Sequence, residues 1–213
     1  MAHINKEFVS FFRDLGKNNN TEWFNDNRKR YETHVKKPFA SLVEDVIARI
    51  QKVDPSVKIK PADAITRINK DIRFAKDKTP YNTYVGAVIS SAGKKDKSVP
   101  GLYLQLSHDK SLIFGGAYVL DPVQLKKVGS RIAADLGGFS KLYKDKTFRE
   151  YFKEIKGEQA KRLDAEWQKV AGKEPMIANK QFYFNTKLKA SDMLSDDFVD
   201  TVVAHYKTAL PLN

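Results

Sequence analysis

The spacing of the hydrophobic residues changes twice along this chain of 213 residues, and this change restricts the fold more than any other feature. Apolar residues recur every three or four positions up to about residue 52, every second position between about 57 and 120, and again at helical spacing afterwards. Helices and strands each bury one face at their own period. The order helices, strands, helices predicts an α+β fold rather than the alternating repeat of a doubly wound sheet.

The N-terminal part, residues 5–52, is predicted to be helical. Asn5 is placed to cap the first helix. Asn19 and Glu22, three positions apart, predict a capping pair at the start of the next one. Pro38 then interrupts the helical pattern, because proline lacks the N–H that a helix interior needs. We therefore expect either a helical hairpin or a long kinked helix.

The middle part, residues 57–120, is predicted to form the sheet and to hold the main motif. Leu102, Leu104 and Leu106 alternate with polar side chains, which is typical of a strand with one buried face. The short turn that follows joins this strand to the next, so successive strands form an antiparallel meander. The predicted strands are residues 65–68, 84–90, 102–107 and 112–119.

The C-terminal part, residues 121–213, is predicted to be mainly helical. Asp121 and Gln124 predict a capped helix, and Gly137-Gly138 is expected to end it. Further elements are expected at 147–156, 164–171, 181–184 (a strand) and from Ser195 onward. The helices should pack on one face of the meander sheet and at its ends, in a single α+β domain over residues 1–213.

Composition excludes several classes of function. The chain has no cysteine, which excludes disulfides, thiolate metal sites and a cysteine nucleophile. Its four histidines are scattered without ligand spacing, so no metal site is predicted, and no phosphate-binding or dinucleotide glycine fingerprint indicates a cofactor. No apolar run approaches the roughly 18 residues that span a bilayer. We expect a soluble, cytoplasmic protein without a membrane partner.

The formal net charge of +12 suggests a nucleic-acid partner, because lysine and arginine neutralise phosphates. Only nine of the 38 basic residues are arginine, however, and they form no basic tail. Solvated lysine faces are the plainer explanation of such a pattern. A nucleic-acid-binding accessory module and a structural or interaction domain are therefore kept as alternatives.

The densest polar cluster lies between residues 67 and 81, with five basic and two acidic groups in fifteen residues. Guanidinium, ammonium and phenol groups around a carboxylate suit a small anionic ligand that bears phosphate or carboxylate. Asp71 would orient the cations or act as a general base, which makes it the candidate catalytic residue. The predicted ligand-binding residues are Arg67, Lys70, Asp71, Arg73, Lys78, Tyr81, Tyr103 and Tyr118.

A purely structural interpretation of the same residues is equally consistent with the sequence. Asp71 would then pair with Arg67 or Arg73 at the junction between strand and loop, and Tyr81 would hydrogen-bond the backbone.

The pair Gly115-Gly116 falls inside a strand pattern, where glycine marks a bulge or the close approach of another group.

The order of these motifs resembles a bacterial and fungal domain-of-unknown-function family of about this length. The resemblance rests on Arg67…Asp71-x-Arg73-Phe74…Asp77-Lys78-x-x-Tyr81, preceded by Asn18-Asn19-Asn20-x-x-Trp23-Phe24 and followed by Gly115-Gly116-x-Tyr118. Lys70 replaces the arginine that the family usually has, and Phe114 replaces the first of three glycines. The resemblance implies a domain extent and a candidate site, but no reaction.

Overall fold

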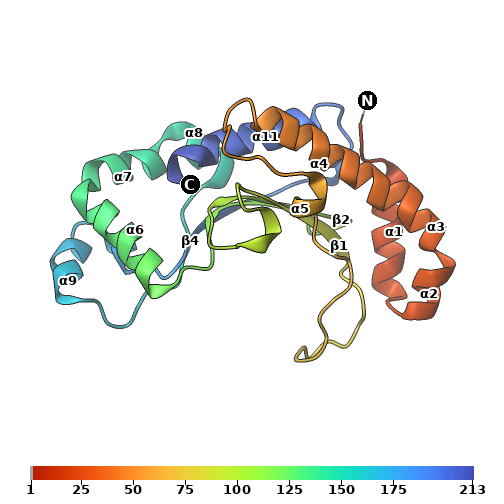
Figure 1. Ribbon diagram of the computed structural model, residues 1–213, viewed down its shortest axis with the longest axis horizontal. Coiled ribbons are helices and arrows are strands. Elements are labelled where there is room, and N and C mark those ends of the chain that lie inside the picture. Colours follow the sequence, from red (N-terminus) through yellow and green to blue (C-terminus); the bar gives the residue numbers. More distant parts are fainter. Residues whose placement is uncertain (1) are drawn as a thin grey trace.

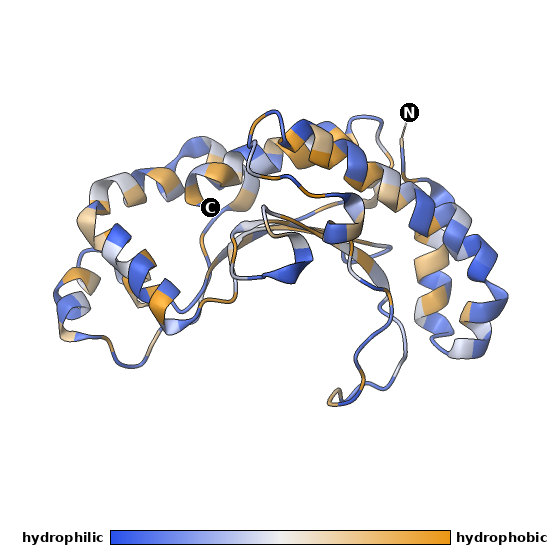
Figure 2. Cartoon of the chain, in the orientation of Figure 1, coloured by the Kyte–Doolittle hydropathy of each residue, from blue (hydrophilic) through white to orange (hydrophobic). Residues whose placement is uncertain are grey.

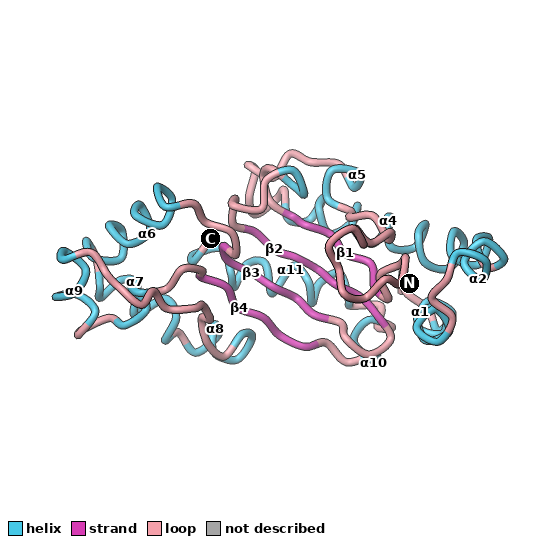
Figure 3. The backbone as a smooth tube through the Cα atoms, turned by 90° about the horizontal axis from the view of Figure 1, so that it is seen from below, coloured by secondary structure: helices cyan, strands magenta, loops and turns pink. Residues whose placement is uncertain are grey.

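The computed structural model describes residues 2–213 and confirms the α+β prediction. A four-stranded antiparallel sheet has the order β1-β2-β3-β4, so neighbours in sequence are neighbours in space (Figure 3). The strands are β1 (Tyr84–Ile89), β2 (Gly101–Ser107), β3 (Leu112–Ala117) and β4 (Phe182–Lys187). The meander predicted from residues 84–119 is therefore present, and the aromatic strand predicted at 181–184 completes it.

One face of the sheet carries the core. Leu104 pairs with Ala87 on β1 and Ile113 on β3, and all three side chains are fully buried. Helix α4 (Lys37–Ile50) packs on β1, α11 (Phe198–Ala209) on β2 and β3, and α8 (Lys146–Phe152) on β4. All three helices cover the same face, and the opposite face is left open on the concave side of the molecule (Figure 1).

The first helix begins as predicted. Asn5 accepts a hydrogen bond from the Phe8 N–H and caps α1 (Lys6–Lys17). A long helical stretch then runs through α3 (Arg28–Tyr31), the π-helical turn η1 (Glu32–Lys36) and α4, so the long-helix alternative holds. The π turn ends at Lys36, two residues before Pro38, and this wider turn accommodates the missing N–H and the bulk of the proline ring.

The sequence prediction for the cap of α2 (Thr21–Asp26) was wrong by one residue. Asn20, not Asn19, accepts the hydrogen bond from the Trp23 N–H. Asn19 instead makes a tertiary contact that local spacing does not encode.

The strand predicted at 65–68 was also wrong. Ile65 forms only a single bridge to β1, and it lies between the short helix α5 (Pro61–Ala64) and the irregular chain that follows.

Helix α6 (Pro122–Ala134) starts with the predicted capping pair, Asp121 and Gln124. It does not extend to Gly137-Gly138. Asp135 ends α6 and caps α7 (Leu136–Lys144) by accepting a hydrogen bond from the Gly138 N–H at 2.8 Å, so the glycines lie inside the next helix. A short polar side chain able to cap thus overrides the tendency of glycine to end a helix.

The remaining elements are short. Helix α8 ends at Phe152, before the end expected at residue 156, and Lys153 follows it with positive φ. The other elements are η2 (Gly93–Lys95), α9 (Ala165–Ala171), η3 (Pro175–Ala178), α10 (Ala190–Met193) and η4 (Leu210–Leu212). Within the described residues 2–213, no helix combines the length and apolar character needed to cross a bilayer.

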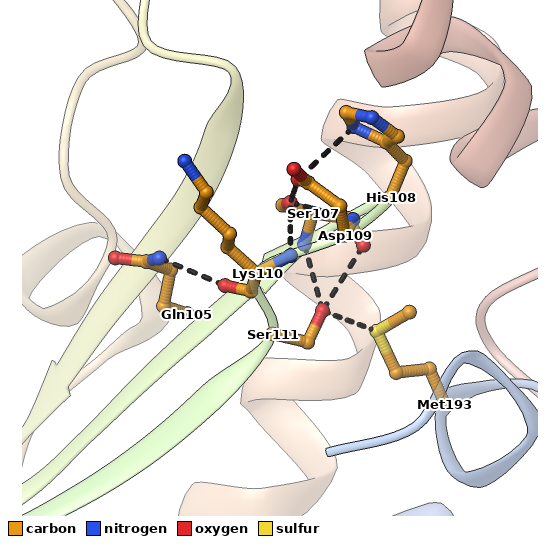
Figure 4. Close-up of polar contacts among 7 residues, drawn as sticks. All are labelled: Gln105, Ser107, His108, Asp109, Lys110, Ser111 and Met193. Atoms are coloured by element: carbon orange, nitrogen blue, oxygen red, sulfur yellow. Dashed lines mark hydrogen bonds and ion pairs between the residues drawn. The ribbon is translucent and has the colours of Figure 1, made fainter. Parts of the chain in front are cut away.

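The turn between β2 and β3 is closed by serine hydroxyls (Figure 4). Ser107 Oγ accepts hydrogen bonds from the N–H groups of Asp109 and Lys110, at 3.1 and 3.0 Å. Ser111 Oγ accepts from the Ser107 N–H at 2.9 Å. His108 Nδ1 lies 3.3 Å from Asp109 Oδ1 but without hydrogen-bond geometry. These contacts fix the strand register and hold the open face in place.

Candidate functional site

A hollow of about 820 Å³ lies over the open face of the sheet, and we call it the sheet cavity. Its floor is formed by alternate residues of all four strands, the positions that face away from the helices. Its wall beside β1 is formed by a segment that leaves the sheet and returns to it. The lining residues are Thr66, Arg67, Asn69, Lys70, Asp71, Asn82, Tyr84, Val88, Lys97, Val99, Gly101, Leu102, Tyr103, Gln105, Phe114, Gly115, Gly116, Tyr118, Tyr183 and Asn185.

Residues 66–82 form this wall, and we call them the arm. The Thr66 N–H donates to the Gly86 carbonyl at 2.8 Å, which fixes the base of the arm to β1. Asn69 and Tyr81 form a further bridge that holds its two limbs together. The arm projects away from the sheet and is largely hydrophilic along its length (Figures 1 and 2). The polar motif of the sequence is thus carried by an irregular hairpin at the sheet edge.

Lys70 lines the cavity but is also tied into the arm. Its ammonium Nζ donates to Asp77 Oδ2 at 2.7 Å and to Thr79 Oγ1 at 2.6 Å. The hydrogen bond from Lys70, with those from Thr79, lowers the pKa of Asp77 to about 2. A lysine suffices for this role because the contacts are single hydrogen bonds rather than a bidentate fork.

Asp71 and Arg73 form a bidentate pair. Arg73 Nε lies 2.9 Å from Asp71 Oδ1, and the terminal guanidinium nitrogen lies 2.6 Å from Oδ2. These hydrogen bonds hold the pKa of the Asp71 carboxyl below its ordinary value. Asp71 lines the cavity, whereas the Arg73 side chain is 76% exposed and lies outside the lining. Arg73 therefore neutralises a carboxylate of the cavity from the outside.

Arg67 also lines the cavity, and within residues 2–213 its guanidinium makes neither a hydrogen bond nor an ion pair. Its charge acts on Asp71 only through space, as the smallest contribution to the lowered pKa of that carboxyl. Lys97, from the connection between β1 and β2, lines the cavity in the same way and without a partner in that range. Two cations of the cavity are thus uncompensated.

Lys78 and Tyr81 lie away from the cavity lining. Lys78 Nζ donates to the Ile72 carbonyl at 2.9 Å and closes the tip of the arm. Tyr81 is only 5% exposed, and its ring stacks on Phe24 of α2 with the ring centroids 4.0 Å apart. Tyr81 is thus part of the core beneath the arm.

Tyr103 lies flat across the neighbouring strand. Its ring and hydroxyl occupy the space that a Cβ on Gly86 would need, so glycine at position 86 is what allows this orientation. Burial, together with the charge and hydrogen bonding of the Tyr84 hydroxyl, raises the pKa of the Tyr103 phenol. The Tyr103 phenol therefore stays neutral at physiological pH.

The rest of the floor is aromatic. Phe114 pairs directly across from Tyr103, and the two ring centroids are 5.9 Å apart. Tyr118 and Tyr183 contact edge to face at the other end, with centroids 5.2 Å apart. The structure thus brings Tyr103, Gln105 and Tyr118 to the same cavity as Arg67, Lys70 and Asp71.

The two adjacent glycines of β3 are each required by the close approach of a different residue of β4. A side chain on Gly115 would collide with the Phe184 ring on the buried face. Gly116 has φ of +87°, a conformation that other residues rarely adopt, and lies against the Phe182 carbonyl. The close approach expected from the sequence is made by β4.

Sequence reasoning missed several cavity residues, among them Asn82, Tyr84, Lys97, Phe114 and Asn185. Their strand members were detectable in principle, because Tyr84, Phe114 and Asn185 alternate with residues of the buried face. Lys97 was not detectable from the sequence, because its position depends on the path of the loop between β1 and β2.

A second hollow, of about 720 Å³, follows the outer side of α6 alone and gathers no comparable set of converging polar groups.

Comparison with protein families matches residues 7–213 to the model described as "Conserved hypothetical protein (DUF2461)". Comparison with curated proteins gives no match, and comparison with solved structures gives none either.

Proposed function

Because the chain belongs to the DUF2461 family, whose description names no reaction, we propose its function from the sheet cavity: it binds a small anionic ligand that bears phosphate or carboxylate. The volume of about 820 Å³ lies in the range of small-molecule sites. Polar and aromatic side chains of the sheet, the arm and the connection between β1 and β2 line it together. This arrangement supports a ligand site better than a packed interface.

The charges of the cavity carry the proposal. Asp71 is neutralised by Arg73, and Lys70 by Asp77, so these four groups cancel pairwise. Arg67 and Lys97 are left without counter-charges among the described residues. Unpaired cations attract and hydrogen-bond an anion, and an arginine can do so with two parallel bonds.

Thermal unfolding in the presence of simple anions tests this function. A ligand that binds the folded state raises the midpoint Tm by mass action. Inorganic phosphate and citrate should each raise Tm relative to chloride at equal ionic strength, and Arg67→Gln should remove the rise. Arg13→Gln, an exposed arginine of α1, is the matched control and should retain it. An equal rise in Arg67→Gln, or none beyond chloride in the unmodified protein, would refute the proposal.

A further inference from the structure

We infer that the ligand of the sheet cavity is a nucleotide, whose base stacks on the aromatic floor while its phosphate meets the cations at the β1 edge. The inference rests on the proposed function and names the class of anion. It comes from the way charge and aromatic rings are separated within the cavity.

The two unpaired cations both belong to segments joined to β1. Arg67 belongs to the arm, whose base is bonded to β1, the edge strand. Lys97 belongs to the connection that leaves the same strand. Both uncompensated charges are thus supplied by segments attached to β1, and a phosphate held by them lies toward this edge.

The aromatic rings lie farther across the sheet. Phe114 is on β3 and Tyr183 on β4, the opposite edge strand, while Tyr103 lies on β2 between them and the cations. Phe114 has no polar group, yet it is partly exposed on the cavity floor beside polar neighbours. Stacking of a planar ring would cover it, and bases stack on such rings whatever their identity.

Amide side chains on either side of the rings add the third requirement, because Asn82 belongs to the arm and Asn185 lies on β4. Asn82 lines the cavity with no hydrogen bond from its side chain within residues 2–213. Asn185 accepts a hydrogen bond from Lys156 Nζ at 3.5 Å, which leaves its amide N–H groups available. Amides offer the paired donor and acceptor that the edge of a base presents. A sugar phosphate or a dicarboxylate would use the cations and the amides but would leave the aromatic rings without a stacking partner.

The Tyr103 ring is positioned in advance for stacking. It is held across Gly86 and against the Tyr84 hydroxyl, so its orientation is set before any ligand enters. A ring that is already ordered loses little conformational entropy on binding. The cavity therefore presents a prepared surface rather than a flexible one.

Calorimetric titration with matched probes tests the inference. Adenosine 5′-monophosphate should bind at least about tenfold more tightly than ribose 5-phosphate, since stacking of one base is worth roughly that factor or more. Adenosine without phosphate should bind more weakly than the nucleotide. Equal affinities for the nucleotide and ribose 5-phosphate would overturn the inference and leave the anion function standing, whereas binding of neither would refute both.

Variants locate the stacking surface. Phe114→Leu keeps the floor apolar and should reduce affinity for the nucleotide about tenfold while leaving that for ribose 5-phosphate unchanged. Phe74→Leu, at the 94% exposed arm tip, is the matched control and should leave both affinities unchanged. A Phe114→Leu protein that binds the nucleotide normally would overturn the placement of the base.

The source of the nucleotide is resolved by one further titration. A single-stranded oligonucleotide that binds no more tightly than the mononucleotide assigns the cavity to free nucleotides. Tighter binding that falls steeply with salt assigns it to one unit of a strand, because several phosphates are then neutralised. An oligonucleotide whose affinity is unaffected by Phe114→Leu would overturn stacking in the cavity as the mode of recognition.

Discussion

The side-chain amide of Asn19 pairs with the backbone of Tyr81 as an adjacent strand would. Asn19 Nδ2 donates to the Tyr81 carbonyl oxygen at 2.8 Å, and the Tyr81 N–H donates to Asn19 Oδ1 at 3.1 Å. The Tyr81 ring meanwhile stacks on Phe24. Two residues 62 positions apart thus join the returning limb of the arm to the N-terminal helices, and they fix where the wall of the cavity stands.

Replacing Asn19 tests this connection. Asn19→Ala removes both hydrogen bonds and leaves two partly buried backbone groups of Tyr81 unpaired, at a cost of about 1–3 kcal/mol in the free energy of unfolding. Chemical denaturation measures the change. Asn18→Ala, which loses only an exposed bond to the Asp14 carbonyl, should cost less. Equal stability of Asn19→Ala and the unmodified protein would show that the two hydrogen bonds between Asn19 and Tyr81 do not stabilise the fold.

The pKa of Asp77 reports the bracing of the arm by Lys70. The charged carboxylate is favoured in the folded state, so its contribution is complete above the ordinary pKa near 4 and is lost as the pH falls toward about 2. Carboxyl chemical shifts followed by NMR should show a pKa of about 2 in the unmodified protein. In Lys70→Met it should move back toward the ordinary value, and an unchanged titration would contradict the bracing role.

Gly86 is the position at which a single methyl group should disturb the site rather than the fold. Gly86→Ala pushes against the end of the Tyr103 side chain, which can swing away, so the core is spared. We expect a reduced rise of Tm with phosphate. Gly16→Ala, in α1 with no atom within 4 Å of the added carbon, should instead keep the rise and add about 0.5–1 kcal/mol of stability. A normal anion response in Gly86→Ala would show that Tyr103 takes no part in binding.

His205 gives the protein a defined dependence on pH. Its ring is buried against Tyr151 and Phe152, and burial lowers its pKa below the ordinary 6.5. The unfolded chain therefore takes up the proton first, and stability falls as the pH drops below about 6.5. Thermal midpoints measured from pH 8 to 5 should fall less steeply in His205→Gln than in the unmodified protein. Parallel curves for the two proteins would rule out this contribution.

The sequence by itself determined the elements whose information is local. Alternation over Leu102, Leu104 and Leu106 specified a strand with one buried face, and Asp121 with Gln124 specified the start of a helix. The connection between β2 and β3 was short enough to require antiparallel neighbours. Each of these features depends on residues within one turn or one strand, so spacing along the chain contains the answer.

Only the tertiary structure decided which polar residues of the motif face a common cavity. Arg67 and Arg73 look alike in sequence, yet one lines the cavity and the other neutralises Asp71 from outside. Tyr81 and Tyr103 are both tyrosines near cations, but one is packed on Phe24 and the other lies over Gly86. The course of an irregular arm is set by contacts such as Asn19 with Tyr81, between segments far apart in the chain, and no local period records them.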